Sequence, residues 1–137
     1  MNAHPSAGEL LKSVSHFLRD ALLPALSGAQ AFNLRISINA IDLVQREIAM
    51  QAGADEREHA RLSRLLGGGA SLEAMRQTLC EKIASGAITL ERPALQQHLR
   101  ETAIDRLAID QPSYSAYLAA TRQNPADQET KNEAPES

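Results

Sequence analysis

Hydrophobic and polar positions alternate with helical spacing along most of the chain, and the longest regular stretch covers residues 31–50. It contains neither proline nor glycine. Its first half also alternates in the manner of a strand, from Phe32 through Leu34 to Ile36. About twenty residues without a turn signal are too many for a typical strand, and the second half shows no alternation. The pattern therefore predicts a central helix over residues 31–50.

The residues before this stretch predict a first helix. Ser6 and Glu9 have the spacing of a capping box, and Pro24 is expected to end or kink the helix that follows. Gly53 is placed to end the central helix in a left-handed conformation. The first helix carries a wide apolar stripe: Leu10, Leu11, Val14, Phe17, Leu18, Ala21 and Leu22.

Further start signals predict more helices toward the C-terminus. Asp55 and Glu58 form a second capping box, expected to open a short helix to residue 66, and Ser71 is expected to cap the next one. Pro93 occupies a favoured first helical position, and residues 113–122 are expected to form a short final helix. Predicted stops are Gly67–Gly69, Gly86 and residues 110–112. The apolar stripe expected on the helix after Pro93 is Leu95, Leu99, Ala103 and Leu107, with Ile104 beside it.

Composition supports a helical fold with an aliphatic core. The chain has 137 residues, of which 43% are hydrophobic but only 3% aromatic, without tryptophan. Leucine and alanine favour helix. The sequence therefore predicts an all-α fold, a compact bundle of about five helices with a short sixth. It also predicts a single domain over residues 5–122 and a disordered acidic tail over residues 123–137.

Charge and cysteine content restrict the classes of partner. The net charge of −3 resides in residues 123–137, which hold four acids against one lysine, so residues 1–122 hold 13 acids and 13 bases. A neutral folded part does not favour nucleic acid or an anionic membrane. The single cysteine, the absence of a signal peptide and the lack of a long apolar run predict a cytoplasmic protein.

Motifs that carry catalysis or metal binding are incomplete in this sequence. Glu56 and His59 have the spacing of half a di-metal site, without a second such pair. Gly67–Gly69 is not followed by the lysine and hydroxyl residue of a phosphate-binding loop. Cys80 has no base nearby in the sequence and is expected to be buried or half-buried. We therefore predict no catalytic residue, no metal and no cofactor, and an enzyme is the least favoured class.

A polar ladder on the central helix is the first candidate site. It consists of Arg35, Asn39, Asp42 and Arg46, with Glu47 adjacent. The helix is apolar over much of its circumference, so Asn39 is expected to be buried, and a buried amide must be hydrogen-bonded. It would serve either as a structural tie or as a ligand contact.

Two further candidates lie outside the central stretch. Arg57, Arg61 and Arg64 form one basic stripe, read either as an anion-binding surface or as a solvated face. Asp110 is expected to cap the turn that follows it, beside Tyr114. We expect this C-terminal corner to meet Asn39 in space and to satisfy its amide.

Three segments together resemble a family of short bacterial helical proteins of unknown function. They are SAGELLKSVSHFLRDALLPAL, NAIDLVQREI and LRETAIDRLAIDQPSY, in this order. Members of that family are often encoded beside aminoglycoside-phosphotransferase-like kinases and acyl-CoA dehydrogenases. The resemblance implies an accessory role near such enzymes and supplies no catalytic residue. The matching positions are Pro24, Asn39, Arg46, Glu47, Leu107, Asp110, Pro112 and Tyr114.

The leading hypothesis is a non-enzymatic accessory protein that associates with itself and with an enzyme encoded beside it. The wide apolar stripe of the first helix supports it, because one small bundle would not cover that surface. The alternative is a bundle that binds a small acyl or CoA-like ligand, supported by the aliphatic core and the stripe of three arginines.

Overall fold

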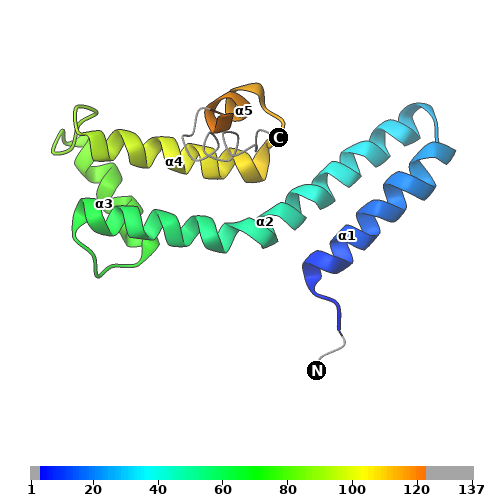
Figure 1. Cartoon of the computed structure of the whole chain (residues 1–137), viewed down its shortest axis with the longest axis horizontal. Coiled ribbons are helices and arrows are strands. Elements are labelled where there is room, and N and C mark those ends of the chain that lie inside the picture. Colours follow the sequence, from blue (N-terminus) through cyan, green and yellow to red (C-terminus); the bar gives the residue numbers. More distant parts are fainter. Residues whose placement is uncertain (1–3, 123–137) are drawn as a thin grey trace, which may run out of the picture. The chain divides into compact units, whose positions relative to one another are not determined.

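Five α-helices build the part of the chain that the computed structural model describes, residues 4–122 (Figure 1). Within this range there is no strand, so the predicted all-α class is confirmed. The predicted tail, residues 123–137, lies outside the described residues. The helices are α1 (Ala7–Phe17), α2 (Gly28–Leu66), α3 (Leu72–Ala84), α4 (Pro93–Asp110) and α5 (Ser115–Arg122).

Contacts group the chain into two compact units that divide between Gly53 and Ala54. The first unit contains α1 and the first part of α2. The second contains the rest of α2 with α3, α4 and α5. That residues 5–122 act as one domain stays a prediction, and each unit is described by itself below.

The start of α1 and the turn after it follow the sequence signals. The Glu9 amide donates to Ser6 Oγ at 3.2 Å, and the Ser6 amide donates to the Glu9 carboxylate at 3.0 Å, which confirms the capping box. Pro24 has no N–H for a continuing helix, and the chain turns into α2 at Gly28, whose φ is +59°. Two short segments connect the helices: the π-helical Leu18–Leu22 and the 3-10-helical Leu23–Ala25.

The helix α2 is longer than predicted and continues through Gly53 for 39 residues. The predicted helix end at Gly53 and the predicted capping box at Asp55 and Glu58 are therefore wrong. Glycine inside a helix costs only about 1 kcal/mol relative to alanine, which tertiary packing readily offsets. The two carboxylates instead form ion pairs with Arg76 of α3.

The second unit has a hydrophobic core contributed by three helices and a loop. Leu62 of α2 packs with Met75 and Leu79 of α3, Ile88 of the following loop and Leu95 of α4. All five are buried. As Figure 1 shows, α4 runs beside the last part of α2. Ser71 caps α3, Pro93 begins α4, and the glycines at 67, 69 and 86 have positive φ where helices stop, all as predicted.

The buried face of α4 differs from the predicted stripe. Leu95 is buried, but Leu99 and Ala103 are exposed, whereas His98 and Ile109 are buried. The difference arises because polar side chains of α2 bind the side of α4 that carries His98, as described below. The expected burial of Cys80 is also wrong, since its side chain is exposed.

Candidate functional site

In the first unit, a carboxylate on α2 joins the two helices. Ser15 Oγ of α1 donates to Asp42 Oδ1 at 2.5 Å, and the Arg19 guanidinium donates to Asp42 Oδ2 at 2.5 Å. Burial alone would raise the pKa of Asp42, but the bonds from Ser15 and Arg19 outweigh it and lower this pKa below its usual value. Asp42 is therefore ionised near neutral pH and fixes α1 to α2.

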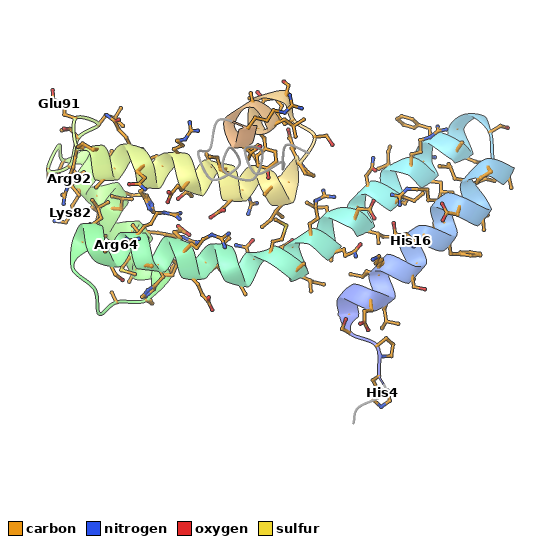
Figure 2. The ribbon with its side chains drawn as sticks, viewed as in Figure 1. His4, His16, Arg64, Lys82, Glu91 and Arg92 are labelled. Carbon is orange, nitrogen blue, oxygen red and sulfur yellow. The ribbon has the colours of Figure 1, made fainter. Side chains whose placement is uncertain are left out.

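A groove between α1 and α2 lies beside this carboxylate and has a volume of about 350 Å³. Its cationic lining comes from Lys12, Arg19 and Arg46, with His16, labelled in Figure 2, on the same helix as Lys12. Asp42 is the acid among the lining residues. Three cations around one carboxylate that is already bonded would attract an anionic group.

Of the remaining residues of the polar ladder, Asn39 is more exposed than predicted. Asn39 and Glu47 are exposed, and Arg46 is half-buried. The prediction that Asn39 is buried and satisfied by the C-terminal corner required a buried amide, and it is therefore wrong. The residues that this part of α2 buries are Ala31 and Ile38, which lie roughly 80–100° around the helix axis from Asn39.

The three arginines predicted to form one stripe divide into two structural residues and one surface residue. The Arg57 guanidinium binds the Asp105 carboxylate of α4, with a shortest distance of 3.0 Å. Arg64 is exposed, and its Nε donates to the Ala60 carbonyl of its own helix at 3.4 Å. Arg57 and Arg64 expose their side chains to solvent but Arg61 does not, so the three arginines do not form one continuous surface.

Arg61 is the most extensively bonded of the three, and its side chain is only 9% exposed. Its Nε donates to His98 Nδ1 at 3.3 Å, and one terminal nitrogen donates to Thr102 Oγ1 at 3.0 Å. The other terminal nitrogen lies 3.3 Å from the Glu101 carboxylate. Arg61 thus fastens α2 to α4 by three different acceptors.

A second pair fastens α3 to α2. Arg76 donates to both carboxylate oxygens of the buried Glu58, at 2.8 and 2.7 Å. The hydrogen bonds from Arg76 lower the pKa of Glu58, although burial opposes them. Such bidentate pairs fix orientation as well as charge. No described residue leaves a buried side-chain nitrogen or oxygen unsatisfied.

His98 is held neutral by its surroundings. Because an arginine can only donate, the Nδ1 atom that faces Arg61 must act as an acceptor and carry no proton. Burial and the nearby Arg61 charge lower the pKa of His98 below its ordinary value of 6.5. The neutral ring is therefore a structural partner of Arg61.

Stability of the second unit is expected to fall as the pH drops from neutral through 6.5, the ordinary pKa of histidine. In this range the unfolded chain takes up a proton at His98 more readily than the folded chain does, so acid favours unfolding. His98→Asn keeps an acceptor near the position of Nδ1 for Arg61 but does not titrate. Chemical denaturation at several pH values should show a smaller slope for this variant. An unchanged slope would contradict the assignment.

The C-terminal corner is an exposed turn. Asp110 pairs with Arg106 of its own helix at 2.7 Å, so the expected capping role of Asp110 is not what its side chain does. The Tyr114 amide donates to the Gln111 carbonyl at 3.0 Å, and its ring is about half exposed. The turn leads into α5, which confirms the predicted short final helix.

Cationic side chains also gather at the end of the second unit where α2 and α3 end and α4 begins. Figure 2 shows Arg64, Lys82 and Arg92 there, with Glu91. All four are exposed. A smaller cavity of about 180 Å³ lies beside Arg64, between α2 and α4. Of its members only Arg64 was a candidate from the sequence, because the others are far from it along the chain.

Comparison with known proteins gives one match. A family model described as a domain of unknown function (DUF6285) matches residues 24–114. Neither a curated protein nor a solved structure matches the chain significantly. In residues 4–122, no helix has the length and apolarity of a membrane span, and no three potential metal ligands cluster. The matched range begins after α1 and ends before α5.

Proposed function

Because the chain belongs to the DUF6285 family, a domain of unknown function, we propose a function from its surfaces: a non-enzymatic accessory protein that binds other proteins through its first unit. The observation that carries the proposal is the exposed apolar surface of that unit. In its described part, residues 4–53, the buried residues are Ser15, Ala31 and Ile38.

Large hydrophobic side chains of this unit face solvent instead of a core. Nine of them are more than a third exposed, and together they expose an area on the order of 800 Å². That is roughly the area that one partner contributes to a standard protein interface. A pair of helices that buries so little is not expected to be stable alone. The nine are Leu10, Val14, Phe17, Leu22, Phe32, Ile36, Val44, Ile48 and Met50.

The helix α1 carries one of these apolar faces. Leu10, Val14 and Phe17 follow one another at steps of four and three residues, so they lie on one side of the helix. Helical faces of this kind bind apolar grooves of other proteins. We assign this face to the enzyme partner, an acyl-CoA dehydrogenase-like or phosphotransferase-like enzyme encoded beside the protein, acting in the cytoplasm. The family resemblance supports this choice of partner.

The alternative function, a site for an acyl or CoA-like ligand, is now supported by different residues. Arg57 and Arg61 bind α4, so they no longer support it. The groove beside Asp42 offers cations instead, with Ala49 and Met50 as apolar lining. That groove is lined mostly by polar and charged side chains, and a much larger apolar surface is exposed on the same unit, so protein binding remains the better supported function.

Phe17→Glu is expected to weaken binding of the enzyme partner at least about tenfold, because it places a charge within a desolvated apolar contact. His16→Glu is the matched control, since His16 is exposed on the same helix and lies roughly 100–160° around the helix axis from Leu10, Val14 and Phe17. Affinities would be measured by biolayer interferometry with the two purified neighbouring enzymes. Wild-type protein that binds neither enzyme would refute the proposed partner.

A further inference from the structure

We infer that a second copy of this chain packs along one exposed side of α2; the inference rests on the proposed function and names a partner for a surface other than the α1 face. Six residues of α2 recur at steps of four, three, four, three and four. This is the spacing with which a helix packs along another helix in a coiled coil. The seam consists of Phe32, Ile36, Asn39, Leu43, Arg46 and Met50.

The seam is accessible although it is largely apolar. Phe32 is 62% exposed and Ile36 is 53% exposed, while Leu43 is half-buried. The six positions fall within roughly 80° of the helix circumference, given 100° per residue. Ala31 and Ile38 are buried in the first unit and lie on a different side of the helix. A partner helix can therefore lie along Phe32, Ile36 and Leu43 while α1 keeps its place, and at Arg46 and Met50 it would border the groove between α1 and α2.

The net charge of the first unit does not oppose a second copy as the occupant. Residues 1–53 contain four acids (Glu9, Asp20, Asp42 and Glu47) and four bases (Lys12, Arg19, Arg35 and Arg46), so two first units carry no net charge that would repel. Two first units packed along their α2 helices, each with its own α1, would form a bundle of four helices.

Asn39 gains a role in this arrangement. It lies in the middle of the seam, and its amide has both donors and an acceptor, so it can pair with polar groups of an identical seam. A single asparagine in a coiled-coil seam restricts register and oligomer number at a cost in stability. The exposed amide of the isolated chain thus becomes a specificity element of the dimer.

The area that the seam can bury indicates how strong the self-association should be. The seam is about 27 Å long, and it buries on the order of 500 Å² on each copy, at the small end of specific interfaces. Area alone does not set affinity, but an interface of this size belongs to the weak class, so we expect a dissociation constant on the order of micromolar. Self-association should therefore depend on concentration within the range of ordinary solution measurements.

Light scattering coupled to size exclusion tests the inference on the full chain. Wild-type protein should approach twice the 14.8 kDa chain mass at tens to hundreds of micromolar. Ile36→Glu should raise the dissociation constant at least about a hundredfold, because each dimer would bury two charges. Ser37→Glu, exposed and outside the seam, should leave it unchanged. Asn39→Leu should lower the dissociation constant at least about tenfold or change the oligomer number.

A monomeric wild type at hundreds of micromolar would overturn the inference, and so would an Ile36→Glu variant that dimerises as wild type does. Circular dichroism of each variant checks that α2 remains helical. A monomeric protein that still binds the enzyme through Phe17 would contradict the inferred dimer but not the proposed function. A dimer that binds neither enzyme would support the dimer and contradict the proposed function.

Discussion

Leu62→Ala is expected to lower the free energy of unfolding by about 3–4 kcal/mol. Leu62 has no solvent exposure and packs against Met75, Leu79 and Leu95 in the core of the second unit. The substitution removes buried methyl and methylene groups and leaves a cavity that three helices cannot fully close. Urea denaturation followed by circular dichroism measures the change.

Leu99→Ala provides the matched control for this prediction. Leu99 lies one turn after Leu95 on α4 and is 41% exposed, so its truncation should cost less than about 1 kcal/mol. Equal losses for the two variants would mean that the buried face of α4 is the one carrying Leu99. That result would contradict the packing described above.

Arg61→Ala is expected to cost about 2–3 kcal/mol. The substitution removes the hydrogen bonds to His98 and Thr102 and the ion pair with Glu101, and it leaves the buried imidazole without its donor. Arg61→Lys should recover only part of the loss, because an ammonium group cannot reproduce the geometry of the planar guanidinium.

Arg64→Ala is the control for Arg61, since it lies on the same helix less than one turn away. Its side chain is exposed and bonds only weakly to a carbonyl of its own helix, so the change should stay within about 0.5 kcal/mol. If both variants lost the same stability, Arg61 would not be the residue that fastens α2 to α4. Both are measured by the same denaturation experiment.

Local rules were sufficient for most helix ends. Ser6 and Ser71 cap helices as their sequences indicate, and Pro93 begins α4. Gly86 follows α3 with a positive φ. These signals act within a few residues, so a single sequence contains them. The same reasoning predicted the helical type of the elements correctly, but it divided α2 into two helices.

Local rules failed where distant residues decide the outcome. Gly53 has the position of a helix end, yet α2 continues through it. The carboxylates of Asp55 and Glu58 were read as caps, whereas Arg76, eighteen or more positions later, binds both. A capping signal predicts only what a side chain can do nearby, and a well-placed arginine outweighs it.

The polar network between α2 and α4 corresponds to a pattern in the sequence. Arg57 binds Asp105, and Arg61 binds His98 and Thr102, so positions that rise along α2 meet positions that fall along α4. Complementary polar groups at helical spacing on two helices, taken in antiparallel order, could have indicated this pairing. Hydrophobicity alone indicates the apolar stripe through Leu99 and Ala103 as the buried face of α4, whereas both residues are exposed.

The exposure of Asn39 had a different cause. The sequence shows that α2 is apolar around much of its circumference, but not which side another part of the same chain covers. The first unit covers the side of Ala31 and Ile38 and leaves the seam with Phe32 and Ile36 exposed. The amide was therefore predicted to be buried within one chain, whereas we now place its burial in a contact between two chains.

Hydrogen–deuterium exchange of residues 31–50 tests most directly whether protein contacts cover the first unit. Two helices that bury this little surface should open often when alone, and contact with another protein should suppress the opening. We expect slow exchange at high protein concentration or with the enzyme partner, and markedly faster exchange on dilution. Exchange in this segment that is equally slow at every concentration, with and without the enzyme, would contradict a first unit built for protein contacts.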